Sequence, residues 1–117
     1  MPEETPAVTL LFSSEFKARL RALAKRYRSI RADLQLLLDE LRSGNFVGDR
    51  IPGTRYVVFK VRLKNSDIQK GKSAGYRVIY QLSSNTCILL ILIYSKSDRS
   101  DIPATQIREI IENFDLS

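Results

Sequence analysis

The chain has 117 residues, of which 44% are hydrophobic and 27% are charged, so it is long enough for one globular domain with its own core. Nineteen Lys and Arg against thirteen Asp and Glu give a formal net charge of +6, which favours nucleic acid or an acidic protein as a partner. One Cys excludes an internal disulfide, and the lack of His argues against zinc sites and histidine-based acid–base catalysis. We expect no cofactor and no metal.

No segment predicts secretion or membrane insertion. Residues 1–6 are polar, contain two Pro and predict a flexible end rather than a signal peptide. The apolar run Cys87–Tyr94 has eight residues, far fewer than the roughly 20 that a membrane-spanning helix needs. We therefore expect a cytoplasmic protein with no membrane partner, formed by a single domain over residues 1–117.

The first part of the chain predicts a short strand and a helical hairpin. The apolar run 8–12 precedes two serines, and two sets of apolar residues at helical spacing follow. The first set is Phe16, Leu20, Leu23, Ala24 and Tyr27, and the second is Ile30, Leu34, Leu37, Leu38 and Leu41. Ser13 or Ser14 is expected to cap the first helix and Ser29 the second, and Gly44 is expected to end the hairpin.

Three strands are predicted after a turn-rich loop at residues 44–55. The segment 56–64 alternates: its apolar face is Val57, Phe59, Val61 and Leu63, and its cationic face is Lys60, Arg62 and Lys64. The segment 76–82 alternates again, with Arg77 opposite its apolar face. The continuously apolar run 87–94 predicts a central strand covered on both faces. Short connections make the three strands an antiparallel meander.

A last helix is predicted to begin near Asp101–Pro103, with Ile107, Ile110, Ile111 and Phe114 as its apolar face. The element order is therefore β-α-α-β-β-β-α, an α+β fold in which the helical hairpin packs on one face of an antiparallel sheet. The other face is left partly open, with Lys60, Arg62, Arg77 and Lys96 around it. Periodicity does not settle which edge strand pairs with the N-terminal run.

The predicted sheet region is strongly cationic. Residues 55–99 contain nine Lys and Arg and two Asp, a balance that favours a polyanionic ligand. The cations of the first helix, from Lys17 to Arg26, are interpreted as a face exposed to solvent.

This element order and three sequence segments resemble the RelE/ParE toxin superfamily, and most of all its RelE/HigB-like branch. The segments are FKVRL at 59–63, GKSAGYRVIYQL at 71–82 and IYSKSDRSDI at 93–102. The resemblance implies the toxin of a type II toxin–antitoxin module: a small basic endoribonuclease that cleaves mRNA in the ribosomal A site and inhibits translation. It also implies a cognate antitoxin, the ribosome and mRNA as partners. We expect a monomer when the antitoxin is absent.

The resemblance implies a set of site residues. Lys60 and Arg62 match the family's basic pair, Arg77 matches the arginine of its GYR motif, and Lys96 lies where many members have a catalytic basic residue. The residues expected to bind RNA or the ribosome are Lys64, Lys70, Lys72 and Arg99. The chain departs from the family in its last helix, which lacks the Tyr of well-studied members and has Pro103 and Ala104 in the corresponding region.

RNA can be cleaved without a metal when its 2′-OH attacks the adjacent phosphorus. The reaction needs a base for the 2′-OH, positive charge for the crowded phosphorane and an acid for the 5′ oxygen. Arginine suits the second role because its planar guanidinium donates bidentate hydrogen bonds to phosphate. Lysine can serve in the other two roles when neighbouring cations lower its pKa.

Other interpretations stay open at this point. The chain could be a ParE-like toxin that inhibits a protein target such as DNA gyrase, or a non-catalytic nucleic-acid-binding module. Lys60 and Arg62 could form a solvated strand face. Arg77 could be an inward-pointing structural arginine that pairs with Asp98 or Asp101.

Overall fold

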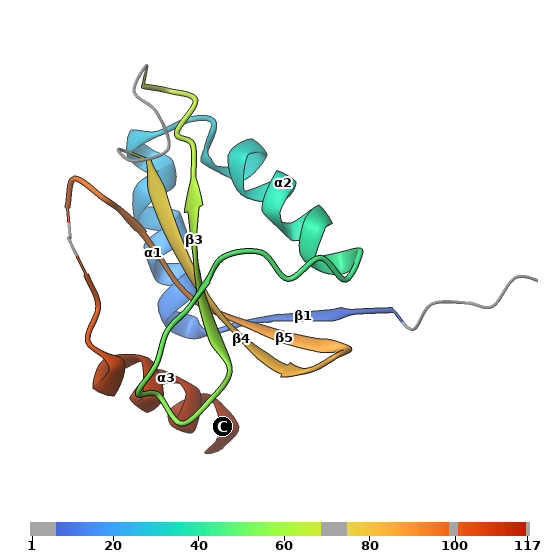
Figure 1. Ribbon diagram of the computed structural model, residues 1–117. Coiled ribbons are helices and arrows are strands. Elements are labelled where there is room, and N and C mark those ends of the chain that lie inside the picture. Colours follow the sequence, from blue (N-terminus) through green and yellow to red (C-terminus); the bar gives the residue numbers. More distant parts are fainter. Residues whose placement is uncertain (1–6, 69–74, 99–100, 117) are drawn as a thin grey trace, which may run out of the picture.

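The computed structural model describes residues 7–68, 75–98 and 101–116, and the expected flexible end at 1–6 lies outside them. The elements in chain order are β1 (Thr9–Phe12), α1 (Ser14–Arg26), α2 (Ile30–Arg42), β2 (Asp49–Arg50), β3 (Val58–Leu63), β4 (Tyr76–Ser84), β5 (Cys87–Ser95) and α3 (Ala104–Leu116). The strands form one sheet with helices on both faces (Figure 1). The predicted α+β class and helical hairpin are confirmed.

The sheet has the strand order β1-β5-β4-β3-β2. The three long strands form the predicted antiparallel meander. The N-terminal strand lies parallel to β5, with Thr9 opposite Cys87 and Phe12 opposite Leu90. The sheet is therefore mixed: it contains the predicted antiparallel strands and one parallel pair, and the pairing that periodicity left open is settled.

The prediction of a plain loop at residues 44–55 was wrong, because this segment contains β2. Asp49 pairs with Lys60 and Arg50 with Phe59, which adds a fifth strand beside β3. Gly48 permits the close approach: its φ is 114°, and a Cβ there would lie 2.7 Å from the Lys60 carbonyl oxygen. A strand of two residues is too short to show alternation, so periodicity could not detect it.

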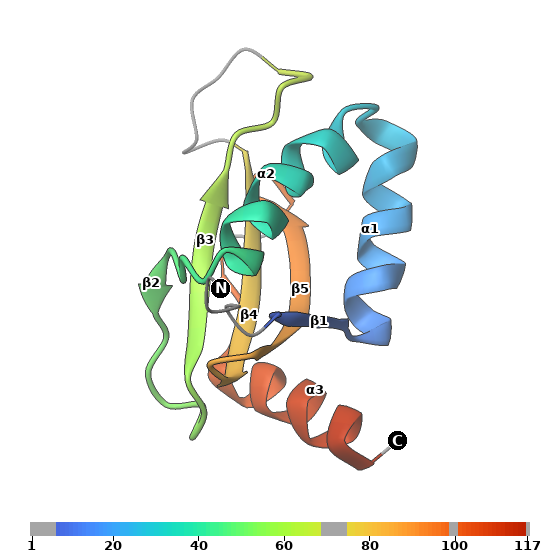
Figure 2. The same cartoon turned by 90° about the vertical axis from the view of Figure 1, so that its right-hand side faces the viewer.

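Two hydrophobic clusters cover opposite faces of the sheet. The first joins the helical hairpin to β3, β4 and β5, and includes every apolar position predicted for α1 and α2. The second joins Ile107 and Ile111 of α3 to Ile79, Leu89 and Leu92. Figure 2 shows α1 and α2 on one side of the sheet and α3 at one end of the strands. Strand β5 is consequently buried on both faces, as predicted.

Side-chain hydrogen bonds fix the start of the helical hairpin and the turn between its two helices. Ser13 caps α1, since its Oγ accepts from the Phe16 N–H at 2.9 Å and donates to the Ile91 carbonyl at 2.7 Å. Ser29 occupies the N-cap position of α2 but makes no side-chain cap bond. Its N–H and hydroxyl instead donate to the Asp67 carboxylate, which ties the chain after β3 to the hairpin.

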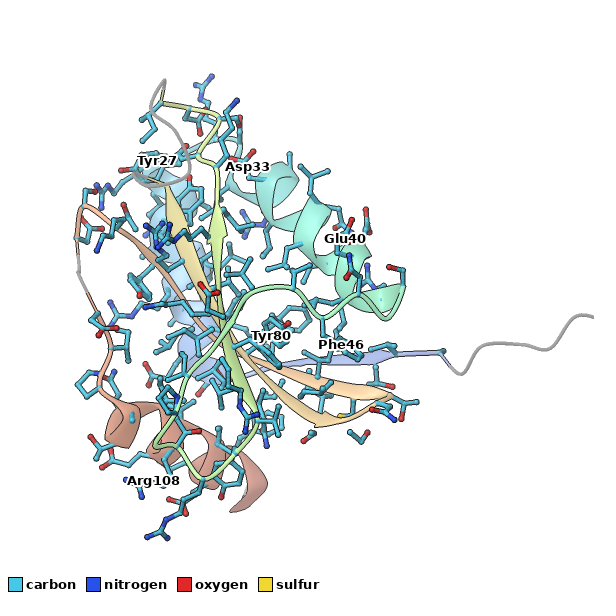
Figure 3. The ribbon with its side chains drawn as sticks, in the orientation of Figure 1. Tyr27, Asp33, Glu40, Phe46, Tyr80 and Arg108 are labelled. Atoms are coloured by element: carbon cyan, nitrogen blue, oxygen red, sulfur yellow. The ribbon has the colours of Figure 1, made fainter. Side chains whose placement is uncertain are left out.

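Tyr80 joins the sheet to the chain that leads into β2. Its hydroxyl donates to the Val47 carbonyl at 2.6 Å, and its ring stacks on Phe59 at 5.4 Å between centroids. Figure 3 shows Tyr80 beside Phe46 in the cluster under the hairpin. Burial raises the pKa of Tyr80 to about 12.

We predict that Tyr80→Phe lowers the free energy of unfolding by about 0.5–1.5 kcal/mol at neutral pH, because one hydrogen bond to Val47 is lost. The pKa of Tyr80 is raised in the folded state from 10.0 to about 12, so its contribution is complete below pH 10.0 and is lost as the pH rises through about 12. Urea denaturation at several alkaline pH values measures this. A stability difference between the two proteins that stays constant above pH 10.0 would contradict the assignment.

Candidate functional site

A groove of about 450 Å³ lies between β2, β3 and the start of α3, and we call it the β2–β3 groove. It is lined by Asp49, Arg50, Ile51, Pro52, Lys60, Arg62, Asp101, Ile102, Pro103 and Ala104. Lys60 and Arg62 alternate along β3 with side chains that pack under the helical hairpin, so the groove opens on the other face of the sheet.

Lys60 pairs with one carboxylate in this groove and lies opposite a second acidic residue in the sheet. Its Nζ is 3.7 Å from Asp101 Oδ1, and Asp49 is its partner in the β2–β3 pairing. The Lys60 side chain is 32% exposed and that of Asp101 is 76% exposed, so the ion pair is weakly held and easily exchanged. An anion that enters the groove can therefore replace Asp101 at the Lys60 ammonium group.

A row of three side chains crosses the sheet beside Lys60. Arg62 lies opposite Arg77, and Arg77 lies opposite Tyr94. Arg77 is only 5% exposed, and its Nη1 donates to the Tyr76 carbonyl at 3.2 Å. Burial lowers the pKa of Arg77, the charge of Arg62 lowers it further, and Tyr94 partly offsets both. Like charges opposite each other disfavour the pairing, so an anion at Arg62 would stabilise it.

Close backbone packing at Gly75 holds the end of β3, the start of β4 and the end of β5 together beside Arg77. A Cβ at Gly75 would collide with the Leu63 carbonyl, so the start of β4 can lie against the end of β3 only with glycine there. The Lys96 N–H donates to the Gly75 carbonyl at 3.0 Å, which ties the end of β5 to the same point. The glycine of the GYR segment thus has a structural role that positions Arg77.

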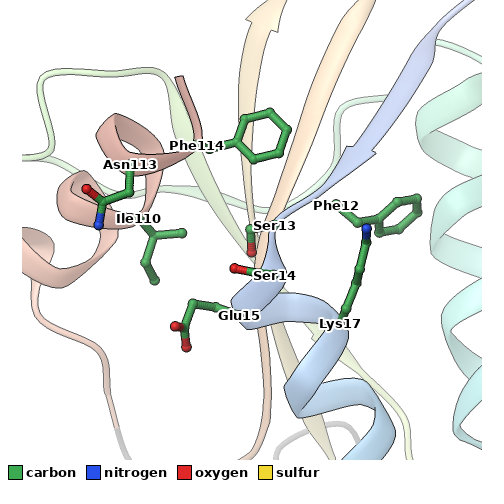
Figure 4. Close-up of a pocket in the computed structure, with 8 residues that line it drawn as sticks. All are labelled: Phe12, Ser13, Ser14, Glu15, Lys17, Ile110, Asn113 and Phe114. Atoms are coloured by element: carbon green, nitrogen blue, oxygen red, sulfur yellow. The ribbon is translucent and has the colours of Figure 1, made fainter. Parts of the chain in front are cut away.

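A second cavity, of about 330 Å³, lies between the start of α1 and α3 (Figure 4). It contains one cation, Lys17, which Figure 4 shows on the opposite side of the helix start from Glu15. The hydroxyl of Ser13 in its wall is already used for the α1 cap and the bond to Ile91. The cavity lacks the clustered cations that distinguish the β2–β3 groove.

The described part of the chain contains neither a candidate metal site nor a candidate membrane-spanning helix. It holds no group of three or more His, Cys, Asp or Glu placed to bind a metal ion. None of its helices is both long and apolar enough to span a bilayer.

Comparison with solved structures identifies the architecture. The chain superimposes on the E. coli toxin RelE, solved in the free state as a variant with two arginines replaced by alanine, with a TM-score of 0.57. The likeness covers 92% of this chain and 97% of the toxin, at 18% sequence identity.

The chain has a RelE-like fold.

At this level of identity the likeness shows the fold alone. No family model matches the sequence, and no curated protein matches it either. The functional residues must therefore be judged from the geometry of this chain.

The RelE-like fold brings some of the predicted site residues together. Lys60 and Arg62 share the β2–β3 groove, and Lys64 lies just beyond Arg62 at the end of β3. Arg77 adjoins Arg62 but is buried in the sheet, not exposed on an open face. Lys96 is partly exposed directly after β5. Lys70, Lys72 and Arg99 lie outside the described residues.

Sequence reasoning missed three residues around the groove. Asp49 belongs to a strand too short to predict, and Asp101 was considered only as a helix cap or a partner of Arg77. Tyr94 was read as part of an apolar strand, and only the strand register places it beside Arg77. The carboxylates suggested as partners of Arg77 pair with other cations: Asp98 with Arg26 at 2.7 Å and Asp101 with Lys60.

We predict that Arg62→Gln leaves the free energy of unfolding unchanged or raises it by up to about 1 kcal/mol, because it removes a like charge opposite Arg77. The matched control is Arg42→Gln, in which an exposed helical arginine 3.8 Å from Asp39 is neutralised. Urea denaturation at low ionic strength compares the two variants with the wild type. A loss of more than about 1 kcal/mol for Arg62→Gln alone would show that Arg62 stabilises the sheet.

Proposed function

We propose that this chain is the toxin of a toxin–antitoxin pair and acts as a metal-independent endoribonuclease on ribosome-bound mRNA. The observation that carries the proposal is Arg62 in the wall of the β2–β3 groove, with Lys60 beside it and the buried Arg77 opposite it on β4, on a RelE-like fold. The charges of two adjacent guanidinium groups repel each other, and a phosphate bound beside them offsets that repulsion and matches the guanidinium geometry.

In the proposed reaction, the 2′ oxygen of one nucleotide attacks the adjacent phosphorus. A bond forms between O2′ and phosphorus while the bond from phosphorus to O5′ breaks; a base takes the proton of the 2′-OH and an acid gives a proton to O5′. The products are a 2′,3′-cyclic phosphate and a 5′-OH. Arg62 contacts the phosphate, and Arg77 behind it strengthens the positive potential as charge develops on the phosphorane.

Lys60 is the proposed proton-transfer group of the groove. It reaches the phosphate after the exposed ion pair to Asp101 is exchanged for the substrate. Lys96 is the second proposed group, at the end of β5 next to Gly75. Pro103 and Ala104 line the groove in the region that corresponds to the tyrosine-bearing helix of well-studied RelE-like toxins, so the proton transfers are assigned to lysines.

The antitoxin is proposed to bind the hollow of about 440 Å³ between α2 and β3. Its wall contains Leu37 and Val61, its rim contains Leu36 with 70% of the residue exposed, and Arg62 and Lys64 lie along one side. An amphipathic segment with Asp or Glu opposite these cations would cover the apolar wall and neutralise Arg62 at the same time.

We predict that Arg62→Ala reduces mRNA cleavage roughly 10²–10³-fold, the cost of losing one donor to a developing oxyanion. Arg77→Gln is also expected to reduce cleavage, because it removes the positive charge behind Arg62, and it leaves a smaller cavity than alanine would at this buried site. The measurement is cell-free translation followed by mapping of mRNA ends. Arg42→Ala, in an exposed position of α2 outside the groove, should cleave like the wild type.

A thermal unfolding curve of each variant serves as the control for whether that variant is folded. Wild-type cleavage by folded Arg62→Ala and Arg77→Gln proteins would remove this site from the reaction. Blocked replication with intact mRNA would instead indicate a protein target such as DNA gyrase.

We also predict that cleavage survives excess EDTA in an assay that controls separately for ribosome integrity, because no metal takes part in the proposed attack. The products should carry 2′,3′-cyclic or 3′-phosphate ends and 5′-OH ends, which enzymatic end-labelling distinguishes. Fragments with 5′-phosphate ends would contradict attack by the 2′-OH.

A further inference from the structure

Besides the cationic sheet region at residues 55–99, the chain has a second cationic segment, residues 17–31. This segment contains seven of the nineteen Lys and Arg and none of the thirteen Asp and Glu. The rest of the chain carries twelve cations and thirteen acids, so it has no positive net charge of its own. The segment covers α1 and the start of α2, outside the β2–β3 groove.

Six of these cations are exposed, and one of them, Arg26, pairs with Asp98. We call the other five the cationic ridge: Lys17, Arg21, Lys25, Arg28 and Arg31. The first three recur every four residues in α1, so they form one stripe with a rise of about 6 Å between neighbours. Arg28 and Arg31 extend the segment through the turn into the first turn of α2. Within the described residues none of the five takes part in an ion pair.

The ridge works against the stability of the helices that carry it. Like charges four residues apart, as in Lys17–Arg21 and Arg21–Lys25, destabilise a helix. Arg31 lies in the first turn of α2, where the helix dipole disfavours a cation. Only Lys25, in the last turn of α1, is favourably placed. The stability of the two helices therefore does not explain why these five cations are present, whereas binding of a polyanionic ligand would explain it.

The surface around the ridge selects the kind of polyanion. The apolar side chains Phe16 and Leu23 of α1 are buried against the sheet, and the exposed residues between the cations include only small apolar ones, Ala18 and Ala22. An anionic membrane would require an exposed apolar helix face, and an acidic protein partner would require apolar anchors. A sugar–phosphate backbone requires only regularly spaced cations, and Arg is well suited to bind it.

We propose that the cationic ridge is a docking surface for the sugar–phosphate backbone of RNA, distinct from the β2–β3 groove. Figure 2 shows α1 and β2 on opposite sides of the molecule, so one phosphate cannot reach both. The ridge holds one stretch of a large RNA while the groove receives another. The choice of RNA over DNA rests on the proposed function.

The test uses a fluorescent 2′-O-methyl RNA hairpin, which has no free 2′-OH and cannot be cleaved by the proposed reaction. Fluorescence anisotropy gives its affinity over a range of salt concentrations for two double variants. Arg21→Gln with Arg28→Gln neutralises two ridge arginines. The control, Arg42→Gln with Arg108→Gln, makes the same chemical and charge change on α2 and α3.

We expect the ridge variant to bind the hairpin about tenfold more weakly at low salt, with the slope of log affinity against log salt reduced by about two. The control should stay close to the wild type. The ridge variant should also unfold at the same temperature as the wild type or a higher one, because repulsion between like charges is relieved. Weaker binding together with undiminished stability distinguishes a ligand site from a structural one.

Equal losses in the two variants would overturn the proposal, since net charge alone would then explain binding. Failure of the wild type to bind the hairpin would overturn it too, as would tighter binding to phosphatidylserine vesicles or to polyglutamate. A DNA hairpin that binds as tightly as the RNA hairpin would contradict the proposal that the ridge is specific for RNA. None of these outcomes depends on cleavage, so the ridge and the proposed ribonuclease activity can fail independently.

Discussion

Strand β5 must be buried on both faces, and the rest of the architecture follows from that requirement. Its run from Ile88 to Ile93 has no polar side chain, so each face needs an apolar cover. The helical hairpin covers one face, and α3 covers part of the other. The extra residue Ile91, where the pairing of β4 with β5 shifts, places Ile91 and Leu92 together in the α3 cluster. Because α3 covers only one end of the strands, the other end is left for polar groups.

The polar end of the sheet concentrates charge in a way that folding alone does not explain. Arg77 is buried with Arg62 opposite it, and Lys60 one step along β3 pairs with an exposed carboxylate. Each of these contacts becomes more favourable when an anion enters the β2–β3 groove. Arg62 gains a counterion, the charge that lowers the pKa of Arg77 is compensated, and Lys60 exchanges Asp101 for the ligand. The cationic ridge follows the same reasoning: its helix cations repel one another, and a polyanion bound there would relieve that repulsion.

Most of the fold could be predicted from the sequence because its signals are periodic. The apolar positions of α1, α2 and α3 and the alternation of β4 were predicted correctly, and so was the apolar face of β3 from Phe59 to Leu63. The predicted face also included Val57, but the structure buries Val58 on the other face instead. Three features could not be predicted, each for a physical reason. A two-residue β2 has no period, the parallel pairing of β1 with β5 depends on tertiary packing, and Ser29 bonds to Asp67 from a distant part of the chain.

The sequence predicts which cations belong to the candidate site, but it does not predict their positions relative to one another. Alternation places Lys60 and Arg62 on one face, yet only the register across three strands brings Arg62, Arg77 and Tyr94 into one row. The carboxylates Asp49 and Asp101 come from elements whose position depends on how β2 and α3 pack. Burial of Arg77 likewise follows from its central strand and not from its neighbours in sequence.

The most direct test of the account is a crystal structure of the protein with a short RNA whose 2′-OH groups are methylated. The account predicts a backbone phosphate in the β2–β3 groove, bonded to the Arg62 guanidinium and the Lys60 ammonium group, with Asp101 released from Lys60. A groove that stays empty of phosphate, with the Lys60–Asp101 pair intact while RNA is bound elsewhere, would contradict it.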